Sequence, residues 1–127
     1  NNIRPFYQTG NRFEWKSKTE EYSLNNPGTD RVLVPVLAPP SEIGIVVFNI
    51  INGTLVGSYV FACSPSDTDI APTDTFFDIS TIASSRHASV TKNILLDSSS
   101  RFAYRVSYSN ANIKVFAHAN GWIDTGI

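Results

Sequence analysis

The chain has 127 residues, which is enough for one domain with a hydrophobic core of its own. Its 10 basic and 11 acidic residues give a formal net charge of -1, so the total charge provides no long-range attraction to nucleic acid or to an anionic membrane surface. No apolar run approaches the roughly 18 residues of a membrane-spanning helix, so we expect no nucleic-acid partner and no membrane insertion.

The residue types favour strands and turns over helices. Met is absent, and Ser, Thr, Asn, Val, Ile and aromatic residues dominate. The single Cys63 forms no internal disulfide, and its apolar neighbours indicate a small buried residue and not a reactive thiol. The chain begins without Met and without the layout of a signal peptide, so we expect residues 1–10 to be a linker from a longer chain and residues 11–127 to be a single domain.

The first predicted strands precede a pair of prolines. Arg12–Lys16 alternates polar and apolar residues, which predicts a half-buried strand. A period of two resumes at Tyr22–Leu24, which favours a hairpin over a helix, and the sequence Asn-Asn-Pro-Gly at residues 25–28 indicates a turn. Arg31–Leu37 is apolar around Pro35, and because proline removes a donor from the ladder this run is expected to be an edge strand or a bulge.

The strongest local signal is Asn52-Gly53, which separates two apolar runs between Glu42 and Cys63. This dipeptide is typical of a type I′ turn, so the sequence predicts a β-hairpin over residues 42–63. Its first arm is apolar on both faces, with Ile43, Ile45 and Val47 on one face and Val46, Phe48 and Ile50 on the other. Two apolar faces predict either a central strand or a contact with another subunit.

Two polar loops follow. Residues 64–75 are the longest stretch without periodicity, and long loops on a rigid β scaffold often bind ligands. Asp67, Asp69 and Asp74 have oxygen ligands suited to calcium, but the glycine and the terminal glutamate of an EF-hand loop are missing. A solvated acidic loop is therefore favoured, and no metal site is predicted. Residues 84–87 form the second polar loop.

The last third of the chain predicts three more strands. Residues 89–97 are expected to pair with the strictly alternating run 101–109 through the serine turn at 98–100, and Asn110–Asn112 is expected to close a hairpin with residues 113–119. About eight predicted strands with regularly spaced turns are compatible with both a β-sandwich and a β-barrel. We predict an all-β, antiparallel β-sandwich of the jelly-roll type.

Candidate catalytic groups form no recognisable motif. His87 and His118 are the only histidines, and no Gly-x-Ser-x-Gly elbow accompanies them. His118 shares its predicted strand face with Lys114 and Phe116, at a surface or an interface. The sequence does not rule out a pair of carboxylates placed for glycoside hydrolysis, because the distance between two carboxylates depends on the fold. Nothing in the sequence favours such a pair. The sequon Asn52-Gly53-Thr54 is explained by the predicted turn. We expect no catalysis and no cofactor.

The chain ends with Gly121-Trp122-Ile123-Asp124-Thr125, followed by Gly126 and Ile127. This short stretch resembles the carboxyl end of many bacteriophage tail fibre and tailspike proteins, which often close with a Gly-Trp-Ile-Asp-Thr type sequence followed by Arg. Here Gly126 stands where that Arg would be. The resemblance agrees with a start that lacks Met and with a β-rich composition.

The resemblance implies a C-terminal receptor-binding domain on a phage tail, outside the bacterial cell. Such tips look like homotrimers that recognise a host surface glycan or another host receptor. Flat aromatic rings stack against sugars while polar side chains bind the hydroxyls, so the expected ligand-binding residues are Trp15, Asp67, Asp69, Asp74, Arg86, His87 and Trp122. The alternatives are a structural virion domain, such as a trimerisation cap, folding cap or capsid decoration, and a polysaccharide depolymerase.

Overall fold

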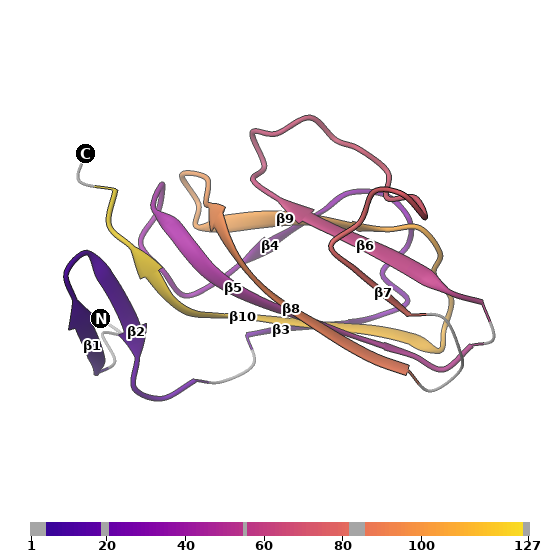
Figure 1. Cartoon of the computed structure of the whole chain (residues 1–127), viewed down its shortest axis with the longest axis horizontal. Coiled ribbons are helices and arrows are strands. Elements are labelled where there is room, and N and C mark those ends of the chain that lie inside the picture. The colour runs from indigo at the N-terminus through magenta and orange to yellow at the C-terminus, as the bar shows by residue number, and fades with distance from the viewer. Residues whose placement is uncertain (1–4, 19–20, 55, 82–85, 126–127) are drawn as a thin grey trace.

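The computed structural model describes residues 5–18, 21–54, 56–81 and 86–125, with only the backbone of Arg86. These residues form ten strands in two antiparallel sheets and contain no helix (Figure 1). The strands are β1 (Phe6–Thr9), β2 (Arg12–Trp15), β3 (Tyr22–Asn25), β4 (Val32–Pro35), β5 (Ile43–Asn52), β6 (Ser58–Cys63), β7 (Ile79–Thr81), β8 (Arg86–Leu95), β9 (Arg101–Val106) and β10 (Ile113–Ile123). The prediction of an all-β sandwich is confirmed.

The order of the strands is that of a jelly roll. In the first sheet β3 pairs with β10, β10 with β5, and β5 with β8, while the second sheet has the order β4-β9-β6-β7. From β3 onward the chain changes sheets at every connection except β6 to β7. This alternation between two four-stranded layers matches the double-sheet jelly roll. The hairpin of β1 and β2 joins the first sheet at the C-terminal end of β10, where β2 pairs with residues 121–123.

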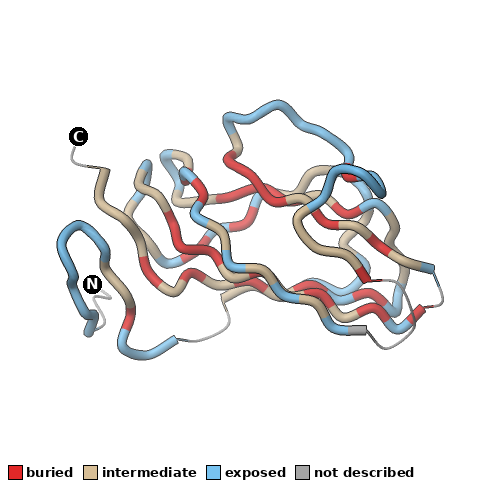
Figure 2. Tube along the Cα trace, in the orientation of Figure 1, coloured by how far each residue is buried: buried red, intermediate tan, exposed pale blue. Residues whose placement is uncertain are grey.

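The core lies between the inner faces of the two sheets. Phe48 of β5 packs against Tyr104 and Phe102 of β9, with ring centroids 4.8 and 6.3 Å apart. Burial alternates along β5 from Val46 to Asn52, and Figure 2 shows buried segments that recur along the strands; in β9 the small Ala103 is buried together with Phe102 and Tyr104. Strand β5 pairs with β10 on one edge and β8 on the other, so the prediction of a central position is confirmed.

Three predicted hairpins are wrong, because their strands lie in different sheets. Strands β5 and β6, β8 and β9, and β9 and β10 are neighbours in sequence, yet none of these pairs is hydrogen-bonded. Alternation shows which face of a strand is buried but not which strand lies beside it. The turn residues between these strands therefore carry the chain across the sandwich, not back along the same sheet.

The start of the chain also differs from the prediction. Residues 6–9 fall in the expected linker but form β1, which pairs with β2 around a turn at Gly10, where φ is +61°. Strands β2 and β3 do not pair with each other, as the predicted hairpin required, but pair in succession with the same edge of β10. The edge position expected from Pro35 is confirmed, since β4 is an outer strand of the second sheet. Residues 1–4 lie outside the described residues.

Asn52 explains why the strongest turn signal does not produce a type I′ hairpin. Its fully buried side chain accepts hydrogen bonds from the Thr54 amide at 2.8 Å and the Thr54 hydroxyl at 2.7 Å. Its Nδ2 donates to the Val56 carbonyl and the Thr81 hydroxyl, both at 2.8 Å. Neither Asn52 nor Gly53 has the positive φ that a type I′ turn requires. The side-chain amide of Asn52, the first residue of the sequon, is therefore buried and hydrogen-bonded where the chain crosses from one sheet to the other.

Asp97 holds the connection between β8 and β9. Its Oδ1 accepts hydrogen bonds from the amides of Ser99 and Arg101, and its Oδ2 accepts one from Arg101 Nε, each at 2.9 Å. Partial burial alone would raise the pKa of Asp97, but the hydrogen bonds and the positive charge of Arg101 together lower it.

We expect Asp97→Ala to lower the free energy of unfolding by about 1 kcal/mol at neutral pH. The folded-state pKa of Asp97 lies below the unfolded-state value of roughly 3.9, so the stabilisation is complete above that value and is lost as the pH falls through the folded-state pKa. Urea unfolding of both proteins between about pH 7 and pH 2 measures this. A difference that stays constant over the whole range would contradict a charge-dependent role.

Candidate functional site

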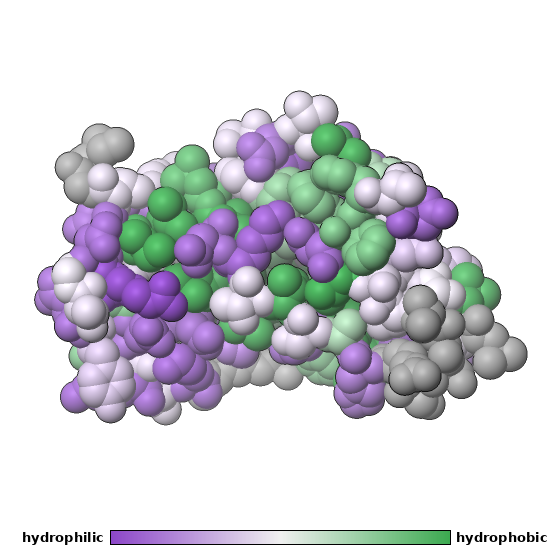
Figure 3. All heavy atoms as spheres, viewed as in Figure 1, coloured by the Kyte–Doolittle hydropathy of each residue, from purple (hydrophilic) through white to green (hydrophobic). Residues whose placement is uncertain are grey.

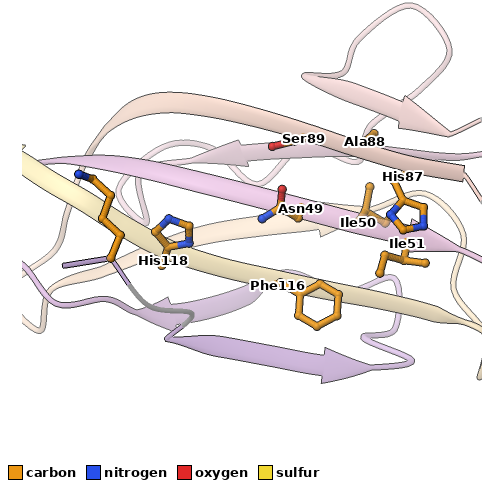
Figure 4. A pocket seen from close by; sticks show the side chains of 9 residues that line it. Asn49, Ile50, Ile51, His87, Ala88, Ser89, Phe116 and His118 are labelled. Carbon is orange, nitrogen blue, oxygen red and sulfur yellow. The ribbon is translucent and has the colours of Figure 1, made fainter. Parts of the chain in front are cut away.

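A groove lies on the outer face of the first sheet (Figure 4). It encloses about 510 Å³ and crosses β8, β5 and β10, where every second side chain points away from the core. Lys18, from the connection between β2 and β3, contributes to its lining. The full set of lining residues is Lys18, Asn49, Ile50, Ile51, His87, Ala88, Ser89, Phe116 and His118.

The pairing of the strands brings these side chains into rows. Asn49 of β5 lies opposite Ser89 of β8 and opposite Phe116 of β10, and Figure 4 shows it between them. Ile51, two residues further along β5, lies opposite His87 of β8. The groove is therefore built on three hydrogen-bonded strands, which hold its side chains in a fixed arrangement.

The lining combines one aromatic ring with several hydrogen-bonding groups. Phe116 is half-buried, and His118 beside it has its Nε2 3.0 Å from Asn120 Oδ1, a contact that orients the imidazole. The side chains of Asn49 and Ser89 make no hydrogen bond with the described residues, so their donors and acceptors are open to a ligand. An apolar ring among amide, hydroxyl and imidazole groups suits a sugar, which has an apolar C–H face and many hydroxyls.

The two predicted tryptophans lie elsewhere, in an aromatic cluster at the β1–β2 end. Trp15 is 5% exposed and donates from Nε1 to the Leu37 carbonyl at 2.9 Å. Trp122 stacks on Phe13, with ring centroids 4.9 Å apart and planes 6° apart, and its centroid is 5.0 Å from that of Trp15. Phe6 meets the edges of this cluster. The structure brings the two tryptophans together and packs them against each other, with Trp15 buried and Trp122 half-buried.

Gly121 lets β2 come close enough to join this cluster. A Cβ atom at Gly121 would overlap the Phe13 carbonyl oxygen and would lie 2.7 Å from Glu14 Cα, both of which are backbone atoms. In register, Gly121 lies opposite Glu14 and Trp122 lies opposite Phe13. The Gly-Trp pair of the C-terminal stretch thus anchors the β1–β2 hairpin to β10.

The predicted acidic loop packs over the outer face of the second sheet. Phe76 and Phe77, which directly follow this loop, lie against Phe61 and Tyr59 of β6, with centroids 4.6 and 5.0 Å apart. Figure 3 shows the hydrophobic side chains that gather over β6 and the loop, at the upper right of that view. Ile70, Phe76 and Phe77 stay 41–44% exposed there.

The three aspartates of this loop have different surroundings. Asp69 pairs with Arg105 at 3.3 Å, and Asp67 accepts a hydrogen bond from the Ser64 amide at 3.2 Å. Asp74 is exposed in the short turn between Thr73 and Phe76. Within the described residues, no group of three or more His, Cys, Asp or Glu side chains is placed to hold a metal ion.

Of the seven predicted ligand-binding residues, His87 lines the groove. The side chain of Arg86 and residues Ser84 and Ser85 of the predicted polar loop lie outside the described residues, while the backbone of Arg86 begins β8. Sequence reasoning missed Lys18, Asn49, Ser89, Phe116 and His118 as site residues. The alternation of Ile113–Ala119 does place Phe116 and His118 on one face, which was a usable signal.

Cys63 is buried, as predicted. Burial raises the pKa of its thiol, although the positive charge of Arg31 and a hydrogen bond from Arg31 Nη2 at 3.6 Å act in the opposite direction. The thiol is therefore kept neutral, which suits packing better than chemistry.

No protein-family model, no curated protein and no solved structure matches this chain. The described residues contain no helix that could span a membrane. The jelly-roll arrangement is common to viral capsid proteins, lectins and cupins, so the fold by itself selects no activity.

Proposed function

We propose that this chain is the receptor-binding domain at the tip of a bacteriophage tail fibre. It binds a polysaccharide of the host cell surface in the groove on the outer face of the first sheet. The observation that carries this proposal is the half-buried Phe116 ring, with Asn49, Ser89 and His118 around it. The C-terminal Gly121–Thr125 stretch supports the phage assignment through its resemblance to tail fibre ends.

Binding is favoured over cleavage. A glycosidase needs two carboxyl groups on either side of the scissile bond, and the described lining residues of the groove include no Asp or Glu. The lining offers groups that orient hydroxyls, which suits recognition of an intact chain. A depolymerase would require an acidic pair at a different place on the molecule.

Trimerisation remains part of the proposal, but it now rests on the resemblance alone. The apolar residues on both faces of β5 suggested a subunit contact. In the structure one face forms the core through Val46, Phe48 and Ile50, and Ile45 on the other face is only 1% exposed within the single chain. Much of the apolar surface of β5 is thus covered without a second copy.

We expect Phe116→Ala to weaken binding of the fluorescently labelled domain to polysaccharide-bearing host cells by roughly fivefold, because one stacked ring contributes on the order of 1 kcal/mol to binding. The assay compares a panel of bacterial strains with and without surface polysaccharide. Phe77→Ala is the matched control, because Phe77 is 41% exposed where it packs against Tyr59 of the second sheet, away from the groove.

The controls separate the alternatives. Unchanged staining by Phe116→Ala, with a loss for Phe77→Ala, would move the site to the second sheet. A wild-type domain that stains none of the strains would favour a structural virion domain. Loss of polysaccharide viscosity during incubation would favour a depolymerase.

A further inference from the structure

Phe116 stands between two hollows on the same sheet face. Besides the groove, a second hollow of about 260 Å³ is lined by Ser23, Leu24, Asn25, Lys114 and Phe116. In register, Phe116 lies opposite Asn49 of β5 on one side and Ser23 of β3 on the other. The two hollows therefore form one strip across β8, β5, β10 and β3, with the Phe116 ring at its middle.

The charged groups along this strip have one sign. Lys18 lines the groove and Lys114 lines the second hollow, and the described lining residues of the two hollows include no Asp or Glu. The chain as a whole carries a net charge of -1, so the positive charge here is local and does not follow from the composition. A surface that presents one sign of charge attracts ligands of the other sign.

Neither lysine is neutralised by a carboxylate of the described residues. Lys18 Nζ donates to the Trp15 carbonyl at 2.9 Å, which positions the ammonium without removing its charge. Two acidic residues of the described part of the chain near β2 and β3, Glu14 and Glu21, have other partners. Glu14 pairs with Arg12 at 3.1 Å, and Glu21 Oε1 accepts hydrogen bonds from the amides of Leu37 and Ala119 at 3.1 and 3.0 Å.

We infer that the ligand of this strip is an acidic polysaccharide whose anionic groups contact Lys18 and Lys114 on the two sides of the Phe116 ring. This inference rests on the proposed function and adds the chemical class of the glycan. A sugar ring stacks on Phe116, its hydroxyls bind Asn49 and Ser89, and carboxylate or phosphate groups on the flanking sugars meet the two ammonium groups. Neutral glycans lack the groups that would pair with these charges.

The test uses the double variant Lys18→Gln/Lys114→Gln and three purified polymers. Alginate carries carboxylates, a glycerol-phosphate teichoic acid carries phosphates, and dextran is neutral. The matched control is Arg12→Gln/Lys16→Gln, which removes the same number of positive charges from exposed positions of the β1–β2 hairpin. Isothermal titration calorimetry at low and high salt measures the affinity, and circular dichroism checks that each variant is folded.

At low salt we expect the wild-type domain to bind one of the two acidic polymers at least tenfold more tightly than dextran. The lysine variant should lose about tenfold in affinity for that polymer and most of the salt dependence, while the control variant stays within about twofold of the wild type. The polymer that binds more tightly identifies carboxylate or phosphate as the anionic group.

Two results would overturn the inference in different ways. Binding that is lost in Phe116→Ala but unchanged in the lysine variant, or a preference for dextran, would refute the acidic ligand and leave the glycan-binding function intact. Binding to all three polymers that is unaffected by Phe116→Ala, or no binding to any of them, would overturn the proposed function and this inference together.

Discussion

Replacing Gly121 with alanine is expected to separate β2 from β10 and to lower the free energy of unfolding by about 3 kcal/mol. The added Cβ atom would overlap the Phe13 carbonyl oxygen and would lie 2.7 Å from Glu14 Cα. Both are backbone atoms of β2, so relief requires the strand to move, unlike a clash with the end of a flexible side chain. Movement of β2 would also break the stack of Phe13 on Trp122.

Two measurements distinguish local detachment from global destabilisation. Trp15 and Trp122 are the only tryptophans, and both lie in the cluster that β2 completes, so their fluorescence should shift to longer wavelength as the indoles become exposed. Urea unfolding followed by circular dichroism reports the whole sandwich. Gly10→Ala is the control, because no atom lies within 4 Å of its added Cβ and only the positive φ of +61° opposes it. Equal stability of the two variants would show that the close approach of β2 does not matter.

The strands and their buried faces were predictable, because alternation is a local property of the chain. The strict alternation of Arg101–Ser109 places Phe102, Tyr104 and Val106 on one face, and the structure buries all three in the core. Strand partners depend on contacts between distant segments, and local turn residues do not encode them. The Asn110–Asn112 turn, for example, is compatible both with a hairpin and with the observed crossing from β9 to β10 in the other sheet.

The candidate site was less predictable than the fold for the same reason. Phe116 and His118 share a face of one strand, which the sequence shows. Asn49 and Ser89 join them only because β5 lies beside β10 and β8 lies beside β5. The tryptophans were expected to be the sugar platform on residue type alone. They pack against each other because β2 approaches β10 closely at Gly121, and no local pattern in the sequence reveals this contact.

Asn52→Ala is expected to lower the free energy of unfolding by about 3 kcal/mol, because it removes the side chain that holds the crossing from β5 to β6. The Asn52 side chain is fully buried and takes part in four hydrogen bonds, with two groups of Thr54, the Val56 carbonyl and the Thr81 hydroxyl. Without it, the buried Thr54 amide loses its partner, at a cost of roughly 1–3 kcal/mol, and the Val56 carbonyl and the Thr81 hydroxyl each lose one hydrogen bond. Nearby hydroxyls satisfy only part of this loss, since Thr54 Oγ1 also lies 2.9 Å from the Val56 carbonyl.

Urea unfolding by circular dichroism measures the effect, with Asn93→Ala as the control because Asn93 is an exposed asparagine on β8. The control should change the free energy of unfolding by less than about 0.5 kcal/mol. If the Asn52-Gly53 pair acted only through its backbone, as in a type I′ turn, Asn52→Gly would be well tolerated, because glycine readily adopts positive φ. The observed side-chain bonds predict instead that Asn52→Gly is at least as destabilising as Asn52→Ala. A glycine variant as stable as the wild type would contradict this account of the crossing.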